Sequence, residues 1–293
     1  LGAAHYRAAC ATCHGAPDQP VDPTAQAMLP VPPFLAPLVE RWEDNELHWI
    51  VTHGLQYTGM PGWPGEDRPD EVWAMVAFLR ALPQLTASEY RALSQRGRET
   101  SSGVVGVSPE TLDRCAACHG LHGSAPASPL IPNLAGQSAG YLARSLREYR
   151  EGARESGFME PVASRLTDRD IESLAAYYSA LSPAPRPDAD SAPSQTGPAL
   201  ATEGPPPPHV APCPARHRGA ARSDYPTLAG QPQVYLQTQL ELWRRGGRAE
   251  TDHGRTMAAI ARQLTVKQME DVTVYYSSLP PAPMPAPQIG APP

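Results

Sequence analysis

Lysine, phenylalanine and long apolar runs are scarce in this chain of 293 residues. Lys267 is the single lysine, three phenylalanines are present, and the formal net charge is −6. A nucleic-acid-binding face needs a basic surplus, so this composition argues against that class of partner. No apolar run approaches the ~20 residues of a membrane-spanning helix. No signal peptide is recognisable either, so any leader or membrane anchor is expected upstream of Leu1.

Cysteine is also sparse, and its spacing is informative. Four of the five cysteines fall into two copies of one pattern, Cys10-Ala11-Thr12-Cys13-His14 and Cys115-Ala116-Ala117-Cys118-His119. The pattern C-x-x-C-H is typical of covalent c-type haem attachment. A third copy, Cys213-Pro214-Ala215-Arg216-His217, has an arginine in place of its second cysteine. The residues expected to attach haem, or to ligate its iron on the first side, are Cys10, Cys13, His14, Cys115, Cys118, His119, Cys213 and His217.

The motifs mark three repeated units, and the second and third match closely. Cys115 and Cys213 are 98 residues apart, and Leu166-Thr167 recurs as Leu264-Thr265 at the same distance. Each unit is predicted to be helix, loop, helix, loop, helix, because self-similarity of this kind means one folding unit used again. No stretch shows convincing strand alternation. The sequence therefore predicts an all-α chain of three tandem domains joined by linkers rich in Pro, Ser and Gly.

Local signals predict where several helices begin. Capping boxes are expected at Thr167 and Thr265, and Ser108-Pro109 is a favourable start for the second unit. In the first unit, a helix near Pro69 should bury a stripe of Val72, Trp73, Val76 and Leu79. The Pro-rich tract 183–214 is expected to be extended rather than helical. The expected division is 1–96, 97–185, a linker at 186–212, 213–283 and a tail at 284–293.

Each iron needs a sixth ligand or an open position, and methionine is the expected ligand. Met60 follows His14 by 46 residues in a Thr-Gly-Met-Pro loop, and Met159 and Met257 follow their histidines by 40 residues. A thioether suits electron transfer because it raises the reduction potential of haem iron. The alternatives are that a methionine only fills core space, or that His48 or His53 ligates the first iron.

The other imidazole nitrogen of each ligating histidine needs a partner, usually a carbonyl. A Pro-x-Leu pattern follows each histidine, which makes the carbonyls of Pro33, Pro132 and Pro226 the candidates. The alternative is that these prolines only shape a turn. The remaining histidines are expected to be exposed to solvent, namely His5, His122, His209 and His253.

These motifs resemble those of the class I c-type cytochromes. The second and third units are similar to the tandem diheme "c-four" cytochromes of bacterial periplasms, through C-x-x-C-H-G, Leu-Ala-Gly-Gln and the methionine loop. The first unit resembles a monohaem class I domain of the Thr-Gly-Met-Pro-x-Trp type. This resemblance implies haem c as the cofactor and an electron carrier in the periplasm, soluble or tethered to the inner membrane. The implied partners are a terminal oxidase, a dehydrogenase or another respiratory complex.

The third unit departs from that pattern at Arg216. Haem there is held by one thioether, held without a covalent bond, or absent with Cys213 a spare thiol. Retention of both His217 and Met257 favours a haem attached through Cys213 alone. Two haems are thus expected from intact motifs and a third from the altered one.

Three function classes compete on these residues. The first is a carrier of single electrons, either a shuttle or the cytochrome subunit of a membrane dehydrogenase complex. The second is a haem peroxidase that uses the altered third site. The third is a zinc site, which is disfavoured because each motif offers three N/S ligands where a structural zinc site has four.

Overall fold

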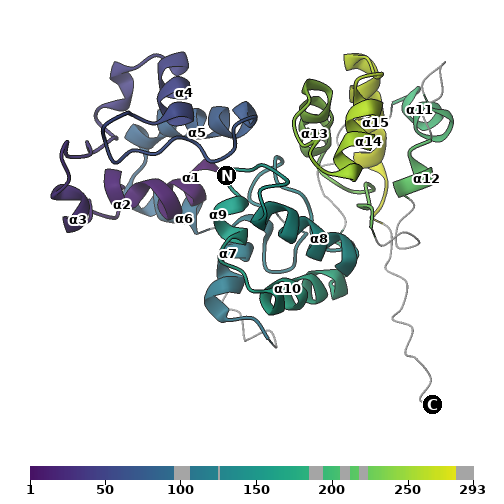
Figure 1. Ribbon diagram of the computed structural model, residues 1–293, viewed down its shortest axis with the longest axis horizontal. Coiled ribbons are helices and arrows are strands. Elements are labelled where there is room, and N and C mark those ends of the chain that lie inside the picture. The colour runs from purple at the N-terminus through teal and green to yellow at the C-terminus, as the bar shows by residue number, and fades with distance from the viewer. Residues whose placement is uncertain (96–105, 125, 185–193, 205–211, 218–223, 282–293) are drawn as a thin grey trace.

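The computed structural model describes residues 1–95, 106–124, 126–184, 194–204, 212–217 and 224–281 (Figure 1). Within these ranges the regular structure is helical, and the one β-type pairing is an isolated bridge between Ala16 and Gln19. None of the described helices combines the length and apolarity needed to cross a bilayer. Three separate hydrophobic cores form, one in each repeated unit. The all-α prediction is therefore confirmed.

The first unit wraps short helices around two buried tyrosines. Tyr6 and Tyr90 are fully buried, and the Tyr6 hydroxyl donates to the carbonyl of Gly15 at 2.8 Å. Trp73 was wrongly placed in the core stripe: it is 47% exposed and lies against His48, while Met75 takes the buried position. The helices are α1 (Gly2–His5), a π-helix (Tyr6–Cys10), α2 (Ala11–His14), α3 (Pro23–Gln26), α4 (Asp44–His53), α5 (Pro69–Ala81) and α6 (Ala87–Ser94), with 3₁₀ turns at Val39–Arg41 and Leu82–Gln84.

The second unit is built on the packing of α8 against α10. It comprises α7 (Pro109–His119), α8 (Ala139–Arg150), α9 (Glu160–Ala163) and α10 (Asp168–Ala180). Ser108 caps α7 with Pro109 in its first turn, and Thr167 forms a capping box with Asp170, as predicted. These caps satisfy backbone N–H groups that otherwise have no partner in a helix.

The third unit repeats this arrangement with its first helix divided. It comprises α11 (Gly197–Glu203), α12 (Pro214–His217), α13 (Gln233–Arg245), α14 (Asp252–Ala261) and α15 (Val266–Ser278). The capping box expected at Thr265 is confirmed. The expectation that 183–214 is extended throughout is wrong, because α11 lies within it and packs against α15. Between its prolines, this segment carries an Ala-Leu-Ala run of good helix formers, and Ala201 is fully buried.

Three other expectations fall partly or wholly outside the described residues. These are the junction of the first and second units, of which 96–105 are not described, more than half of the linker at 186–212, and the tail at 284–293. The second unit lies between the first and the third, and α9 lies on its side towards the first unit (Figure 1). Hydrogen bonds join it to both neighbours.

Candidate haem sites

The three candidate iron-ligating histidines are held in the same way. Each is the last residue of a helix, α2, α7 or α12, and its Nδ1 lies within hydrogen-bond distance of a proline carbonyl. The Nδ1–O distances are 2.8 Å from His14 to Pro33, 3.1 Å from His119 to Pro132 and 2.9 Å from His217 to Pro226. The prediction for the prolines is confirmed. Because Nδ1–H donates its hydrogen bond to the carbonyl, the proton of the neutral imidazole stays on Nδ1 and Nε2 carries the lone pair that a metal needs.

Burial favours the uncharged form of all three imidazoles. It lowers the pKa of His14, His119 and His217, and the bond to the proline carbonyl only partly opposes this shift. The neutral imidazole is therefore favoured, which is the form that binds a metal. Nε2 of His217 is buried and has no hydrogen-bond partner among the described residues. A buried nitrogen without a partner is costly, and an iron ligand would satisfy it.

The first cysteine of each motif occupies the same place in its unit. Cys10, Cys115 and Cys213 each pack against the hydrophobic core of their own unit. Burial raises the pKa of Cys10 and of Cys115 to about 12, with a further increase from the second thiol of each motif. Burial likewise raises the pKa of Cys213. All five cysteines are free of disulfides. Cys213 is thus the structural counterpart of the attachment cysteines.

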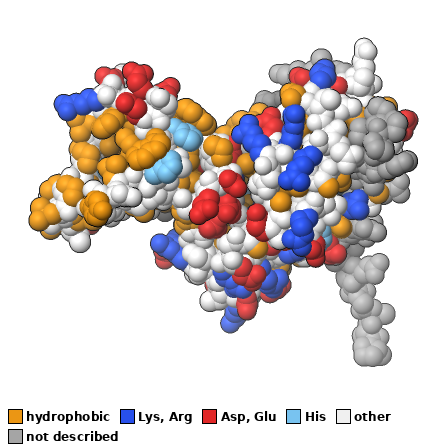
Figure 2. Space-filling view, turned by 45° about the horizontal axis from the view of Figure 1, so that its top comes forward, with side chains coloured by type: hydrophobic (Ala, Val, Ile, Leu, Met, Phe, Trp, Pro, Cys, Tyr) orange, Lys and Arg blue, Asp and Glu red, His pale blue; other side chains and the backbone are white. Residues whose placement is uncertain are grey.

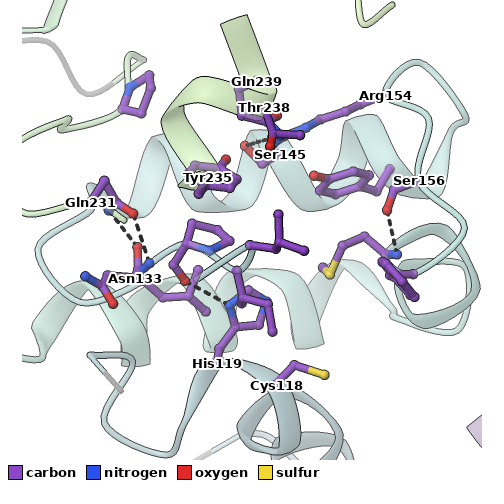
Figure 3. A pocket seen from close by; sticks show the side chains of 18 of the residues that line it. Cys118, His119, Asn133, Ser145, Arg154, Ser156, Gln231, Tyr235, Thr238 and Gln239 are labelled. Carbon is purple, nitrogen blue, oxygen red and sulfur yellow. Dashed lines mark hydrogen bonds between the residues drawn. The ribbon is translucent and has the colours of Figure 1, made fainter. Parts of the chain in front are cut away.

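The second and third ligand sets open onto one cavity of about 860 Å³. Its walls include His119 and Met159 from the second unit and His217 and Met257 from the third. Figure 3 shows His119 and Cys118 on one side of this space and residues of the third unit on the other. The structure therefore brings both predicted His/Met sets together around a volume in the size range of cofactor sites.

Two arginines of this cavity, Arg154 buried and Arg248 half-buried, were missed by sequence reasoning. Arg154 stacks over Tyr149 at 4.4 Å and donates to Ser145 at 3.2 Å, and Arg248 stacks over Trp243 at 4.3 Å. The Nε of each guanidinium is buried without a partner in the described part of the chain. Buried cations need anions, and the carboxylates of a haem fit this requirement.

The 94-residue spacing of these two arginines equals that of the repeated Leu-Ala-Gly-Gln motif. Extending the repeat alignment to charged residues would have found them.

The same motif supplies a reciprocal connection between the second and third units. Gln137 donates to the carbonyl of Thr227 and accepts from its N–H, both at 2.9 Å. Gln231 makes the matching pair with the backbone of Asn133, again at 2.9 Å (Figure 3). Asn133 and Thr227 directly follow the prolines that hold the histidines. The interface is therefore continuous with the backbone that orients both imidazoles.

The first site is less enclosed. Met60 is half-buried in the loop after α4, and its role as ligand stays a prediction. Nε2 of His48 is buried without a partner among the described residues, whereas His53 bonds the carbonyl of Trp49 on its own helix. His48 is therefore the alternative that remains.

Nine of the eleven large apolar side chains exposed in the described ranges belong to the first unit (Figure 2). One of them, Phe34, follows Pro33 directly and lies against Gly15. An exposed apolar patch of this kind marks a ligand groove or a partner surface.

The expectation of exposed histidines is wrong at two positions. His5 packs between Trp63 and Phe158, with ring centroids 4.9 and 4.8 Å away. His253 lies half-buried beside Tyr225. Both histidines lie at contacts between units, His5 against Phe158 and His253 beside Arg144. The sequence of a single repeat does not reveal such contacts. His122 is exposed as expected, and His209 falls outside the described residues.

Comparison with known proteins shows where this arrangement recurs. Residues 1–79 match the family model described as cytochrome c oxidase, cbb3-type, subunit III, and residues 111–182 match that of cytochrome c. A thiosulfate dehydrogenase electron acceptor of Stutzerimonas stutzeri is 34% identical over 70% of this chain and 93% of its own. Cytochrome c4 of Pseudomonas aeruginosa is 31% identical over 68% of this chain and its full length.

Similar solved structures come from the same two groups of proteins, the cytochromes c4 and the thiosulfate dehydrogenases. Acidithiobacillus ferrooxidans cytochrome c4 is 31% identical with a TM-score of 0.51, covering 57% of this chain and 98% of its own. A structure of thiosulfate dehydrogenase TsdBA from Marichromatium purpuratum is 34% identical, again with a TM-score of 0.51. It covers 57% of this chain, and the match spans 36% of that protein.

Proposed function

Because this chain belongs to the class I c-type cytochromes, with repeats of the cytochrome c4 type, we propose that it is a periplasmic multihaem relay for single electrons. The observation that carries the proposal is the repeated histidine–proline pair, together with two methionines in one cavity. Haem, when bound, supplies a reversible one-electron change at its iron. The chain's task is then to hold, bury and tune that group.

The residues of the cavity suit a carrier rather than a catalyst. Met159 lines the second site and Met257 the third. A thioether from each would favour the reduced iron and would occupy the position that a substrate would need. Arg154 and Arg248 offer charge to the propionates within a low-dielectric interior. A peroxidase would need one iron without a strong sixth ligand, and Met257 lines the same cavity as His217. Rapid oxidation of the reduced protein by peroxide would contradict the carrier proposal.

We propose that the third unit holds haem through the single thioether of Cys213. Its position against the core of its unit, the His217–Pro226 bond and the unpartnered Nε2 support this assignment. Arg216 lines the cavity in place of the second thiol. In Cys213→Ser, the denatured chain should lose the mass of one haem, whereas Arg216→Ala should keep it. The same number of covalently bound haems in Cys213→Ser and in the unsubstituted chain would contradict the assignment.

We further propose a dehydrogenase as the electron donor and a terminal oxidase as the acceptor. Two relatives are named as electron acceptors of thiosulfate dehydrogenase, and the first unit matches a domain model named for an oxidase subunit. A sulfur-compound dehydrogenase is therefore the donor class supported best. With Lys267 the single lysine, a charged docking face would use arginine or acidic side chains.

Rapid mixing with reduced dehydrogenase tests the donor. Haem reduction should be fast at low salt and should slow as salt screens the charged faces. No reduction at any ionic strength would refute the donor assignment. Co-purification with a catalytic subunit would identify a fixed subunit of a complex instead of a shuttle.

A further inference from the structure

We propose that Glu71 of the first unit positions Met159, so that the first unit controls ligation at the second haem site. The inference rests on the proposed function, since it takes Met159 as an iron ligand. It goes further by assigning a role to a residue that lies in another unit and belongs to no haem motif. Diheme relatives of the second and third units alone would have no counterpart of this contact.

The Glu71 carboxylate lies at the centre of the contact between the two units. It is on α5, is 3% exposed and accepts three hydrogen bonds. Oε1 accepts from the hydroxyl of Ser156 at 2.6 Å, and Oε2 accepts from the N–H of Gly157 at 2.7 Å and from Trp63 at 3.0 Å. The Ser156 hydroxyl in turn accepts from the N–H of Met159 at 3.1 Å. Two hydrogen bonds therefore link Glu71 to the ligand's own backbone.

The flanking residues of the Met159 loop are held by the first unit as well. Arg68, which pairs with Glu71 at 2.7 Å, donates to the carbonyl of Glu155 at 2.8 Å. Phe158 packs edge-on against Trp63 at 5.2 Å and also contacts His5. Four consecutive residues, 155–158, thus contact the first unit immediately before the methionine. These ring contacts explain why His5 is half-buried and not exposed.

The local structure shows why Met159 needs outside support. It occupies the N-cap position of α9 without a capping side-chain bond, and α9 is four residues long and too short to be stable by itself. Met257 lies inside α14, a helix of ten residues whose first turn is capped by Thr251 of the same unit. A buried carboxylate and guanidinium are costly unless fully bonded, so the Glu71–Arg68 pair beside α9 favours a specific positioning role.

Substitution in the full haem-loaded chain tests this role. Ferric haem with Met ligation gives a weak absorption band at the red edge of the visible spectrum. The loss of intensity in Met159→Leu measures how much of this band comes from the second haem. Glu71→Ala should lose most of that share and lower the reduction potential of one haem, because methionine favours the reduced iron. Glu71→Gln, which keeps an acceptor oxygen, should restore part of both. Ser156→Ala should lower the band intensity and the reduction potential as well, but by less than Glu71→Ala.

Asp18→Ala is the matched control. Asp18 is also a largely buried carboxylate of the first unit, but its ion pairs in the described part of the chain are with Arg7 at 2.6 Å and Arg91 at 3.9 Å, so the band and the potential should stay unchanged. A purely structural Glu71 would lower the unfolding temperature without changing the band or the potential. If Met159→Leu removes a share of the band and Glu71→Ala does not, the positioning role is wrong while the proposed function stands. If Met159→Leu leaves the band intact, the Met159 assignment and the inference both fail.

Discussion

Deleting the Gln137 side chain should uncouple the second and third units at a measurable cost. Gln137→Ala removes the acceptor for the N–H of Thr227 and the donor to its carbonyl, both bonds being 2.9 Å long. Gln137 is 3% exposed and Thr227 is 8% exposed, so the two backbone groups would be left without partners inside the interface. The same reasoning applies to Gln231→Ala and the backbone of Asn133.

The expected cost follows from the desolvation of those groups. Each buried polar group that loses its partner costs about 1–3 kcal/mol. Water can enter the space left by the shortened side chain, so a total of about 2–4 kcal/mol is expected for Gln137→Ala. Gln137→Glu keeps the acceptor and loses the donor, and should still cost about 1–3 kcal/mol. Deleting both Gln137 and Gln231 should cost less than the sum, because the first deletion already loosens the shared interface.

Denaturant unfolding of the haem-loaded chain measures this effect. The free energy of unfolding should fall in the first variant, and the single transition of the linked units should broaden or divide. A Gln137→Ala chain within ~0.5 kcal/mol of the unsubstituted protein, with unchanged cooperativity, would show that these hydrogen bonds do not join the units.

Three further outcomes are expected. Met60→Leu should remove the red-edge band of the first ferric haem, whereas His48→Leu should leave it intact. An unchanged band in Met60→Leu would show that Met60 is not the ligand, and a changed haem spectrum in His48→Leu would then make His48 the ligand. Hydrogen bonds from Thr196 and then Lys267 hold the pKa of Asp271 below its ordinary value. Its stabilisation should thus be present above about pH 4 and be lost as pH falls through the lower folded pKa, a dependence that Asp271→Asn should abolish in acid titrations. The chain made without haem should show weak helical circular dichroism and no cooperative melting, because each core is small; a well-folded apo-protein would contradict this.

Local chemistry explains which features the sequence predicts well. C-x-x-C-H, a capping box and Ser-Pro at a helix start act within a few residues, so Thr167, Thr265 and Ser108 are confirmed directly. The proline partners follow each histidine at a short distance in the same unit, and the repetition identifies them. Composition was a weaker guide for α11, because a Pro-rich average conceals seven residues that can form a helix and bury Ala201.

Contacts between units were beyond prediction for a different reason. Gln137 is separated from Thr227 by 90 residues, and Glu71 from Ser156 by 85, so no local pattern connects them. Periodicity assigned Trp73 to the core because it assumes that one face of a helix is buried, whereas in α5 the ring lies against His48. The repeat marks equivalent residues but says nothing of how the units meet.

The number of haems per chain tests the central claim most directly. It is obtained from the intact mass of the denatured protein together with pyridine haemochrome absorbance. Three haems by both methods are predicted, two from the intact motifs and one through Cys213. Three by absorbance but two by mass would contradict the single thioether. Two by both would leave His217 and Met257 without an iron, end the relay at the second unit and contradict the account.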